Sequence, residues 1–70
     1  MVKAVILVKS PKRLIAAKLR KISLEAFPVS GQFDAVLIVD VEGMSEVRDV
    51  VARVQAIGGV ERTETMMEVQ

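Results

Sequence analysis

The sequence predicts an α+β domain of ferredoxin-like topology, β-α-β-β-α-β, with a four-stranded antiparallel sheet and two helices on one face. Two near-identical apolar pentapeptides support this prediction, AVILV at residues 4–8 and AVLIV at residues 35–39. Each precedes a segment with the apolar spacing of a helix and then a further strand-like run, so the chain contains two β-α-β units. With 70 residues, we expect a single domain spanning residues 1–70.

The first predicted strand, from Val2 to Lys9, is apolar on both faces at its centre, because Ala4 and Ile6 alternate with Val5 and Leu7. The second pentapeptide has the same property. Two helices can cover only one face of the sheet, so the other face needs a second sheet. We therefore expect a homodimer in which two sheets pack face to face, an association of the dimeric α/β barrel type. Since the chain has no cysteine for a disulfide, such association is also the remaining way to stabilise so small a domain.

The first helix is expected to begin with Ser10 as its N-cap and Pro11 at its first position, where a missing N–H costs nothing. It should run for about a dozen residues. Four apolar side chains form its expected buried stripe: Leu14, Ile15, Leu19 and Ile22.

The second strand is expected from about Leu24 to Val29, followed by a short turn at residues 30–32. Pro28 has no N–H to donate, which predicts an edge strand. The topology likewise places the second and fourth strands at the edges.

The second helix has apolar residues at the spacing of an amphipathic helix and should begin near residues 43–45. Gly58 and Gly59 are expected to end it. The predicted buried stripe comprises Val47, Val50, Val51, Val54 and Ile57.

Charge is segregated along the chain. Residues 1–22 carry seven lysines and arginines and no acid, whereas residues 23–70 carry three basic and nine acidic residues. A basic helix can bind phosphate backbones, but we favour a solvated face that pairs with the acidic half of a neighbouring subunit. The aromatic pair of an RNA-recognition domain and a helix-turn-helix pattern are both missing, so direct DNA binding is not expected.

The composition argues against catalysis and against a metal. Without His, Cys, Tyr or Trp, the chain lacks the commonest general base, the thiol nucleophile and the soft metal ligands. Asp34, Asp40 and Glu42 could hold a hard cation, but charged strand ends in solvent explain them better. Ser10 with Lys12 and Arg13 is likewise a weak phosphate signal without a glycine-rich loop. We expect no catalytic residue, no cofactor and no metal.

No membrane association is expected either. The longest apolar runs have about five residues, against the roughly 20 that span a bilayer. Lys3 interrupts the apolar start too early for a signal peptide, so we expect a cytoplasmic protein.

The second half of the chain carries a more specific pattern. Val29, Gly31, Phe33 and Asp34 match V-x-G-x-(Y/F)-D, and Gly59-Val60 with Thr63 and Thr65 match G-V-x-x-T-x-T. This combination resembles the effector-binding RAM domain of the Lrp/AsnC family of feast/famine transcription regulators, over essentially the whole chain. Full-length members of that family begin with a winged helix-turn-helix. Because this chain starts at the first strand, the resemblance implies a stand-alone RAM domain without its own DNA reader.

The resemblance implies that an amino acid or related small molecule binds between subunits. In the family, sheet-to-sheet dimers assemble further, often to octamers, and the effector lies between dimers. The corresponding ligand-binding residues here are Gly31, Phe33, Asp34, Thr63 and Thr65. The chemistry suits a zwitterion, since backbone N–H groups around Gly31 can bind the carboxylate and Asp34 the ammonium. Gln32 and Met67 are candidates to tune specificity.

Four of these residues also have a structural explanation. Gly31 can serve a positive φ in the hairpin, Asp34 can cap the turn, and the two threonines can be ordinary strand residues. Three interpretations follow. The first is an amino-acid sensor, acting alone or in mixed assembly with a full-length Lrp/AsnC regulator. The second is an ACT-like amino-acid-binding module, and the third a small dimeric α/β-barrel enzyme, which would ordinarily need a histidine or tyrosine.

Overall fold

The computed structural model describes residues 1–69, so Gln70, the last residue of the predicted domain, lies outside it. Its elements follow the predicted order β-α-β-β-α-β. They are β1 (Val2–Lys9), α1 (Ile15–Leu19), β2 (Ala26–Pro28), β3 (Ala35–Val41), α2 (Met44–Gln55) and β4 (Arg62–Met67). The predicted α+β, ferredoxin-like fold is confirmed.

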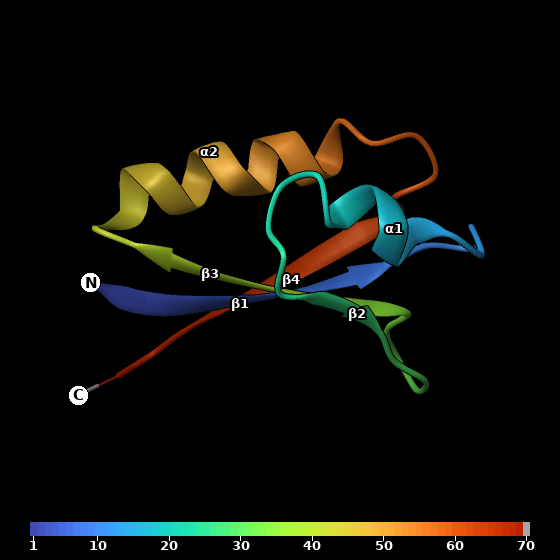
Figure 1. Cartoon of the computed structure of the whole chain (residues 1–70), viewed down its shortest axis with the longest axis horizontal. Coiled ribbons are helices and arrows are strands. Elements are labelled where there is room, and N and C mark those ends of the chain that lie inside the picture. Colours follow the sequence, from blue (N-terminus) through green and yellow to red (C-terminus); the bar gives the residue numbers. More distant parts are fainter. Residues whose placement is uncertain (70) are drawn as a thin grey trace.

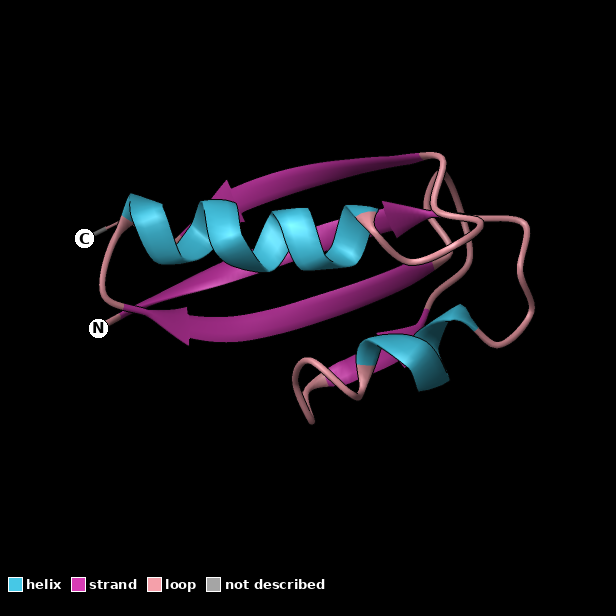
Figure 2. Ribbon diagram, turned by 90° about the horizontal axis from the view of Figure 1, so that it is seen from above, coloured by secondary structure: helices cyan, strands magenta, loops and turns pink. Residues whose placement is uncertain are grey.

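The four strands form one antiparallel sheet in the order β2-β3-β1-β4, which confirms β2 and β4 as its edges. Both helices lie on the same face of the sheet, as Figure 1 shows. Seen from above, α2 runs along the longer strands and α1 lies over β2 (Figure 2). The other face of the sheet carries no helix or strand of residues 1–69, and we call it the open face.

The register of β1 and β3 decides which side chains enter the core. Ile6 pairs with Leu37, and both are fully buried beneath the helices. Alternation then places Val5 opposite Ile38 and Leu7 opposite Val36 on the open face. The prediction that β1 is apolar on both faces is therefore confirmed.

The first helix is much shorter than predicted, and its expected N-cap is wrong. The helix begins at Ile15, after Leu14, without a side-chain cap. Ser10 is instead buried, and its hydroxyl accepts a hydrogen bond from the Lys12 N–H at 3.1 Å. Residues 10–14 thus form a connection at the end of β1. Leu14 is 72% exposed and does not belong to the buried stripe, whereas Ile15 and Leu19 do and Ile22 packs beside them.

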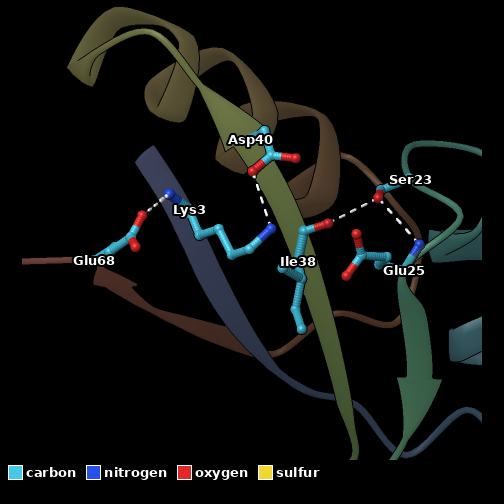
Figure 3. Close-up of polar contacts among 6 residues, drawn as sticks. All are labelled: Lys3, Ser23, Glu25, Ile38, Asp40 and Glu68. Carbon is cyan, nitrogen blue, oxygen red and sulfur yellow. Dashed lines mark hydrogen bonds and ion pairs between the residues drawn. The ribbon is translucent and has the colours of Figure 1, made fainter. Parts of the chain in front are cut away.

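The second strand is also shorter than predicted. Its backbone pairing starts where the Ile38 N–H donates to the Glu25 carbonyl at 2.8 Å, and before that point a serine side chain bonds to β3 in place of the backbone. The Ser23 hydroxyl donates to the Ile38 carbonyl at 2.8 Å and accepts from the Glu25 N–H at 3.2 Å. Leu24 between them is 91% exposed. These Ser23 hydrogen bonds appear beside β3 in Figure 3.

The second helix starts where predicted, but it ends at Gln55, with Ala56 as its C-cap rather than the glycines. Gly59 provides the positive φ, +98°, only in the turn that leads to β4. Val47 and Val54 are buried, and the other three residues of the predicted stripe pack against the core from half-buried positions.

Candidate functional site

The loop between β2 and β3 is held firmly at one end of the sheet. The Val29 N–H donates to the Asp34 carbonyl at 3.0 Å, and the Asp34 N–H donates to the Val8 carbonyl at 2.9 Å. Gly31, at the exposed side of the loop, has φ +131°, which favours glycine. Apart from Gly31 and its two chain neighbours, no atom of the described residues lies within 4 Å of the position a Cβ would take there. The loop therefore presents open backbone on a fixed base.

The Asp34 carboxylate is tied into the protein and is still accessible. Its Oδ2 accepts a hydrogen bond from the Ser10 N–H at 2.9 Å and lies 3.5 Å from the Lys9 Nζ. The side chain remains 38% exposed. Asp34 thus fixes the end of β1 and also presents negative charge to solvent.

Two cations lie beside this loop. Lys9 and Arg62 are register partners at the ends of β1 and β4. The Arg62 guanidinium carbon lies 5.1 Å from the centroid of the Phe33 ring, within the range of a cation–π interaction. We call the set Lys9, Gly31, Phe33, Asp34 and Arg62 the hairpin end. The sequence offered no local signal for Lys9 or Arg62, since only long-range strand pairing brings them to Phe33 and Asp34.

The two predicted threonines share one face of β4, as expected, but this face is turned towards α2. Thr63 accepts a hydrogen bond from the Gln55 Nε2 at 3.2 Å. Thr65 lies opposite Ile6 and lines a groove between α2 and β4, together with Met67. Within one chain, Gly31, Phe33 and Asp34 therefore come together, whereas Thr65 lies apart from them. Gln32 is exposed in the loop.

The open face of the sheet has an apolar centre with charged residues along its rim. Val36 is only 8% exposed, and Val5, Leu7 and Ile38 are half-buried by one another. At one end, the Lys3 Nζ lies 3.1 Å from the Asp40 Oδ1, and the Lys3 N–H donates to the Glu68 Oε1 at 2.9 Å (Figure 3). An apolar patch rimmed by charges is typical of an interaction surface.

The Lrp/AsnC ligand binding domain family matches residues 4–70. The chain belongs to this family. The resemblance predicted from the glycine, aspartate and threonine pattern is thereby confirmed, and the chain is a regulatory ligand-binding domain. Among curated protein sequences no match was found.

Solved structures of other proteins superimpose well on this Lrp/AsnC domain. TTHA0845 from Thermus thermophilus superimposes with a TM-score of 0.88 at 26% identity, over 100% of this chain and 95% of that one. FFRP-DM1 has a TM-score of 0.82 at 23% identity, over 99% and 100% of the two chains. The hypothetical protein PHS023 from Pyrococcus horikoshii has a TM-score of 0.80 at 20% identity, over 100% and 92%. The last two similarities show the fold alone.

Three of the seven basic residues in the N-terminal third of this Lrp/AsnC domain lie around one hollow. Lys12, Arg13, Leu14 and Lys18 line a surface hollow of about 300 Å³. Lys12 and Arg13 lie before α1, not in it, so the predicted basic helix is largely a basic loop. Its pairing with an acidic neighbour stays a prediction.

Residues 1–69 contain no group of three or more His, Cys, Asp or Glu side chains arranged to hold a metal ion. In the same range, neither helix has the length and apolar character that a bilayer crossing requires.

Proposed function

We infer that this Lrp/AsnC domain senses an amino acid or a closely related small molecule at contacts between subunits of a homo-oligomer. The observation that carries the proposal is the hairpin end, where one accessible carboxylate and two cations lie at the base of the loop that contains Gly31. An α-amino acid presents the complementary pair of charges. A non-enzymatic role agrees with the lack of His, Cys, Tyr and Trp in the sequence.

The roles of the individual groups follow from their chemistry. The Arg62 guanidinium is suited to a bidentate contact with a carboxylate, and its stacking on Phe33 restricts its orientation. Asp34 can accept from the ligand's ammonium group while keeping its bond to the Ser10 N–H. Backbone around Gly31 can approach the ligand closely, because no side chain stands there.

A second subunit would complete the site. In a single chain both threonines lie on the helix-facing side of β4, where Thr63 is bonded to Gln55, whereas Lys9 and Arg62 belong to the opposite side. We therefore assign any threonine hydroxyls that contact the ligand to a neighbouring copy. The open face supplies the first association, a dimer of two sheets packed on their apolar centres. Dimers would assemble further, with an octamer as the expected form.

In the cell, such an assembly would act in the cytoplasm on transcription through another protein. A full-length Lrp/AsnC regulator is the expected partner, because its own domain of this family could share the same contacts. Direct DNA binding by this chain is not part of the proposal.

The test is thermal melting of the purified protein against each amino acid at millimolar concentration. A ligand at a hundredfold its Kd adds about 2.7 kcal/mol per site, which shifts the Tm of so small a domain by several degrees. A selective shift that is lost in Arg62→Gln supports the proposal. Arg53→Gln, an exposed arginine in the last turn of α2, on the helix-covered side of the sheet, is the matched control. Absence of any shift, from a protein that sediments as an oligomer, contradicts amino-acid sensing and leaves assembly as the function.

A further inference from the structure

The groove between α2 and the edge strand β4 is a cavity separate from the hairpin end. It has a volume of about 340 Å³, at the small end of the range for ligand pockets. One wall is α2 and the other is the helix-facing side of β4, where Thr65 and Met67 project. The two elements lie side by side in Figures 1 and 2. The groove therefore belongs to one chain and needs no second copy to exist.

The walls of the groove are mostly aliphatic. Val47 is 3% exposed and forms part of the core, while Val51 and Met67 are half-buried beside it. Met44 is exposed at the first turn of α2, and Ala52 leaves space because its side chain is a single methyl group. Such a surface favours an apolar chain over a polar one.

The polar groups of the groove determine which charged and polar groups its ligand can carry. Among residues 1–69, Arg48 is the only charged side chain that lines the groove, and it takes part in neither of the two ion pairs in that range. The other polar groups are the Thr65 hydroxyl and the Gln55 amide, and the latter already donates to Thr63. No carboxylate among the described residues lines the groove, so a ligand's ammonium group would find no charged partner.

We propose that this groove binds a small aliphatic carboxylate without an ammonium group, the oxo acid of a branched-chain amino acid being the best fit. Its carboxylate pairs with the Arg48 guanidinium, its oxo group accepts from the Thr65 hydroxyl, and its branched chain lies against Val47, Val51 and Met67. The proposal does not depend on the hairpin end, which offers both charges and would take the amino acid itself.

The methionines of the chain allow a direct test. Two of the four, Met44 and Met67, line the groove. Met66 pairs with Val5 and points to the opposite face, and Met1 lies before the first strand. We would label the methionine methyl groups with carbon-13 and titrate the intact protein with the oxo acid of leucine, using leucine as the comparison ligand. Saturable shifts of the Met44 and Met67 signals, with Met1 and Met66 nearly unmoved and with weaker shifts for leucine, are expected.

Variants of exposed residues test the assigned roles without disturbing the core. Arg48→Gln should weaken the oxo acid's binding roughly tenfold or more, since a charge-assisted pair is lost. Arg53→Gln, on the same helix but not lining the groove, should bind with unchanged affinity. Ala52→Leu should fill the groove and abolish the shifts.

Three results would overturn the proposal. The first is the absence of any Met44 or Met67 shift at millimolar oxo acid. The second is binding of equal strength in the wild type and in Arg48→Gln. The third is a response confined to Met66 or to the melting temperature, which would place the ligand on the open face or at the hairpin end instead. A failure of amino-acid sensing at the hairpin end would leave the two groove methionines free to respond, so the two proposals can fail separately.

Discussion

The Asp34 Oδ2 accepts a hydrogen bond from the Ser10 N–H at 2.9 Å, which joins the β2–β3 loop to the end of β1. Ser10 is buried, so its N–H depends on this carboxylate for a partner. The same side chain is the one we expect to meet a ligand's ammonium group. Its structural and functional roles must therefore be separated by experiment.

Asparagine and alanine at position 34 provide that separation. Asp34→Asn keeps an acceptor oxygen for the Ser10 N–H but removes the charge, so it should melt near the wild type and lose most of its amino-acid response. Asp34→Ala leaves the Ser10 N–H unpaired and should lower the free energy of unfolding by about 1–3 kcal/mol. Urea unfolding and ligand-dependent melting measure the two effects. A full ligand response in Asp34→Asn would remove the carboxylate charge from the site.

Gly59 is predicted to be essential for the turn between α2 and β4. Its φ is +98°, and a Cβ there would lie 2.4 Å from the Lys12 Cγ. Gly59→Ala should therefore destabilise the fold by about 1–3 kcal/mol, measured by urea unfolding. Gly58→Ala is the matched control, because no atom of residues 1–69 beyond its chain neighbours lies within 4 Å of its Cβ position. Equal stability of the two variants would contradict this account.

The short first helix makes a contrast between two leucines. Leu19 is fully buried and Leu14 is 72% exposed, although both belong to the predicted stripe. Leu19→Ala should cost about 2–5 kcal/mol of unfolding free energy. Leu14→Ala should change it by less than about 0.5 kcal/mol. Chemical denaturation of the two variants tests this directly. A large loss of unfolding free energy in Leu14→Ala would contradict the short helix and favour the longer one.

These residues also show what the sequence could predict. The alternation of side chains in β1 and β3 correctly predicted that the sheet is apolar on both faces, since strand periodicity depends only on neighbours along the chain. The prediction that the first helix begins at Ser10 and Pro11 was wrong. A distant carboxylate, Asp34, binds the Ser10 N–H, and the serine hydroxyl closes a local turn. A helix-cap pattern carries no information about such long-range partners.

The same limit applies to the site. Gly31, Phe33 and Asp34 are close in sequence, and the structure holds them on one loop. Arg62 joins them only through the pairing of β4 with β1, and Arg48 joins Thr65 only through the packing of α2. Sequence motifs therefore identified those residues of each cluster that lie close together along the chain. The arginines, Arg62 and Arg48, could be identified only from the tertiary structure.

The ion pair between Lys3 and Asp40 predicts a dependence of stability on alkaline pH. The hydrogen bond to Asp40, and then its negative charge, raise the pKa of Lys3 above its ordinary 10.5. Because the folded-state pKa is the higher one, the pair stabilises fully below pH 10.5 and its contribution is lost as pH rises through the folded-state pKa. The effect should be small, since both side chains are about half exposed and screened by solvent.

Three proteins isolate this contribution in urea unfolding at neutral pH and above pH 10.5. Relative to Lys3→Met, the wild type should lose its advantage at the higher pH. Lys3→Arg should keep its advantage, because arginine does not deprotonate in this range. A wild-type advantage that is the same at both pH values would show that the pair adds nothing to stability.

We expect subunits to associate through the open face. Leu7 and Val36 are register partners at its apolar centre and point away from the helices. Leu7→Glu places a charge there, and burying it against a second sheet would be strongly unfavourable. We therefore expect the wild type to sediment as a dimer or larger species at micromolar concentration and Leu7→Glu to sediment as a monomer that keeps its far-ultraviolet circular dichroism. The control is Glu64→Gln, at the partner position on β4, which should leave the assembly intact. If Leu7→Glu and the wild type sediment alike, the subunits associate through another surface.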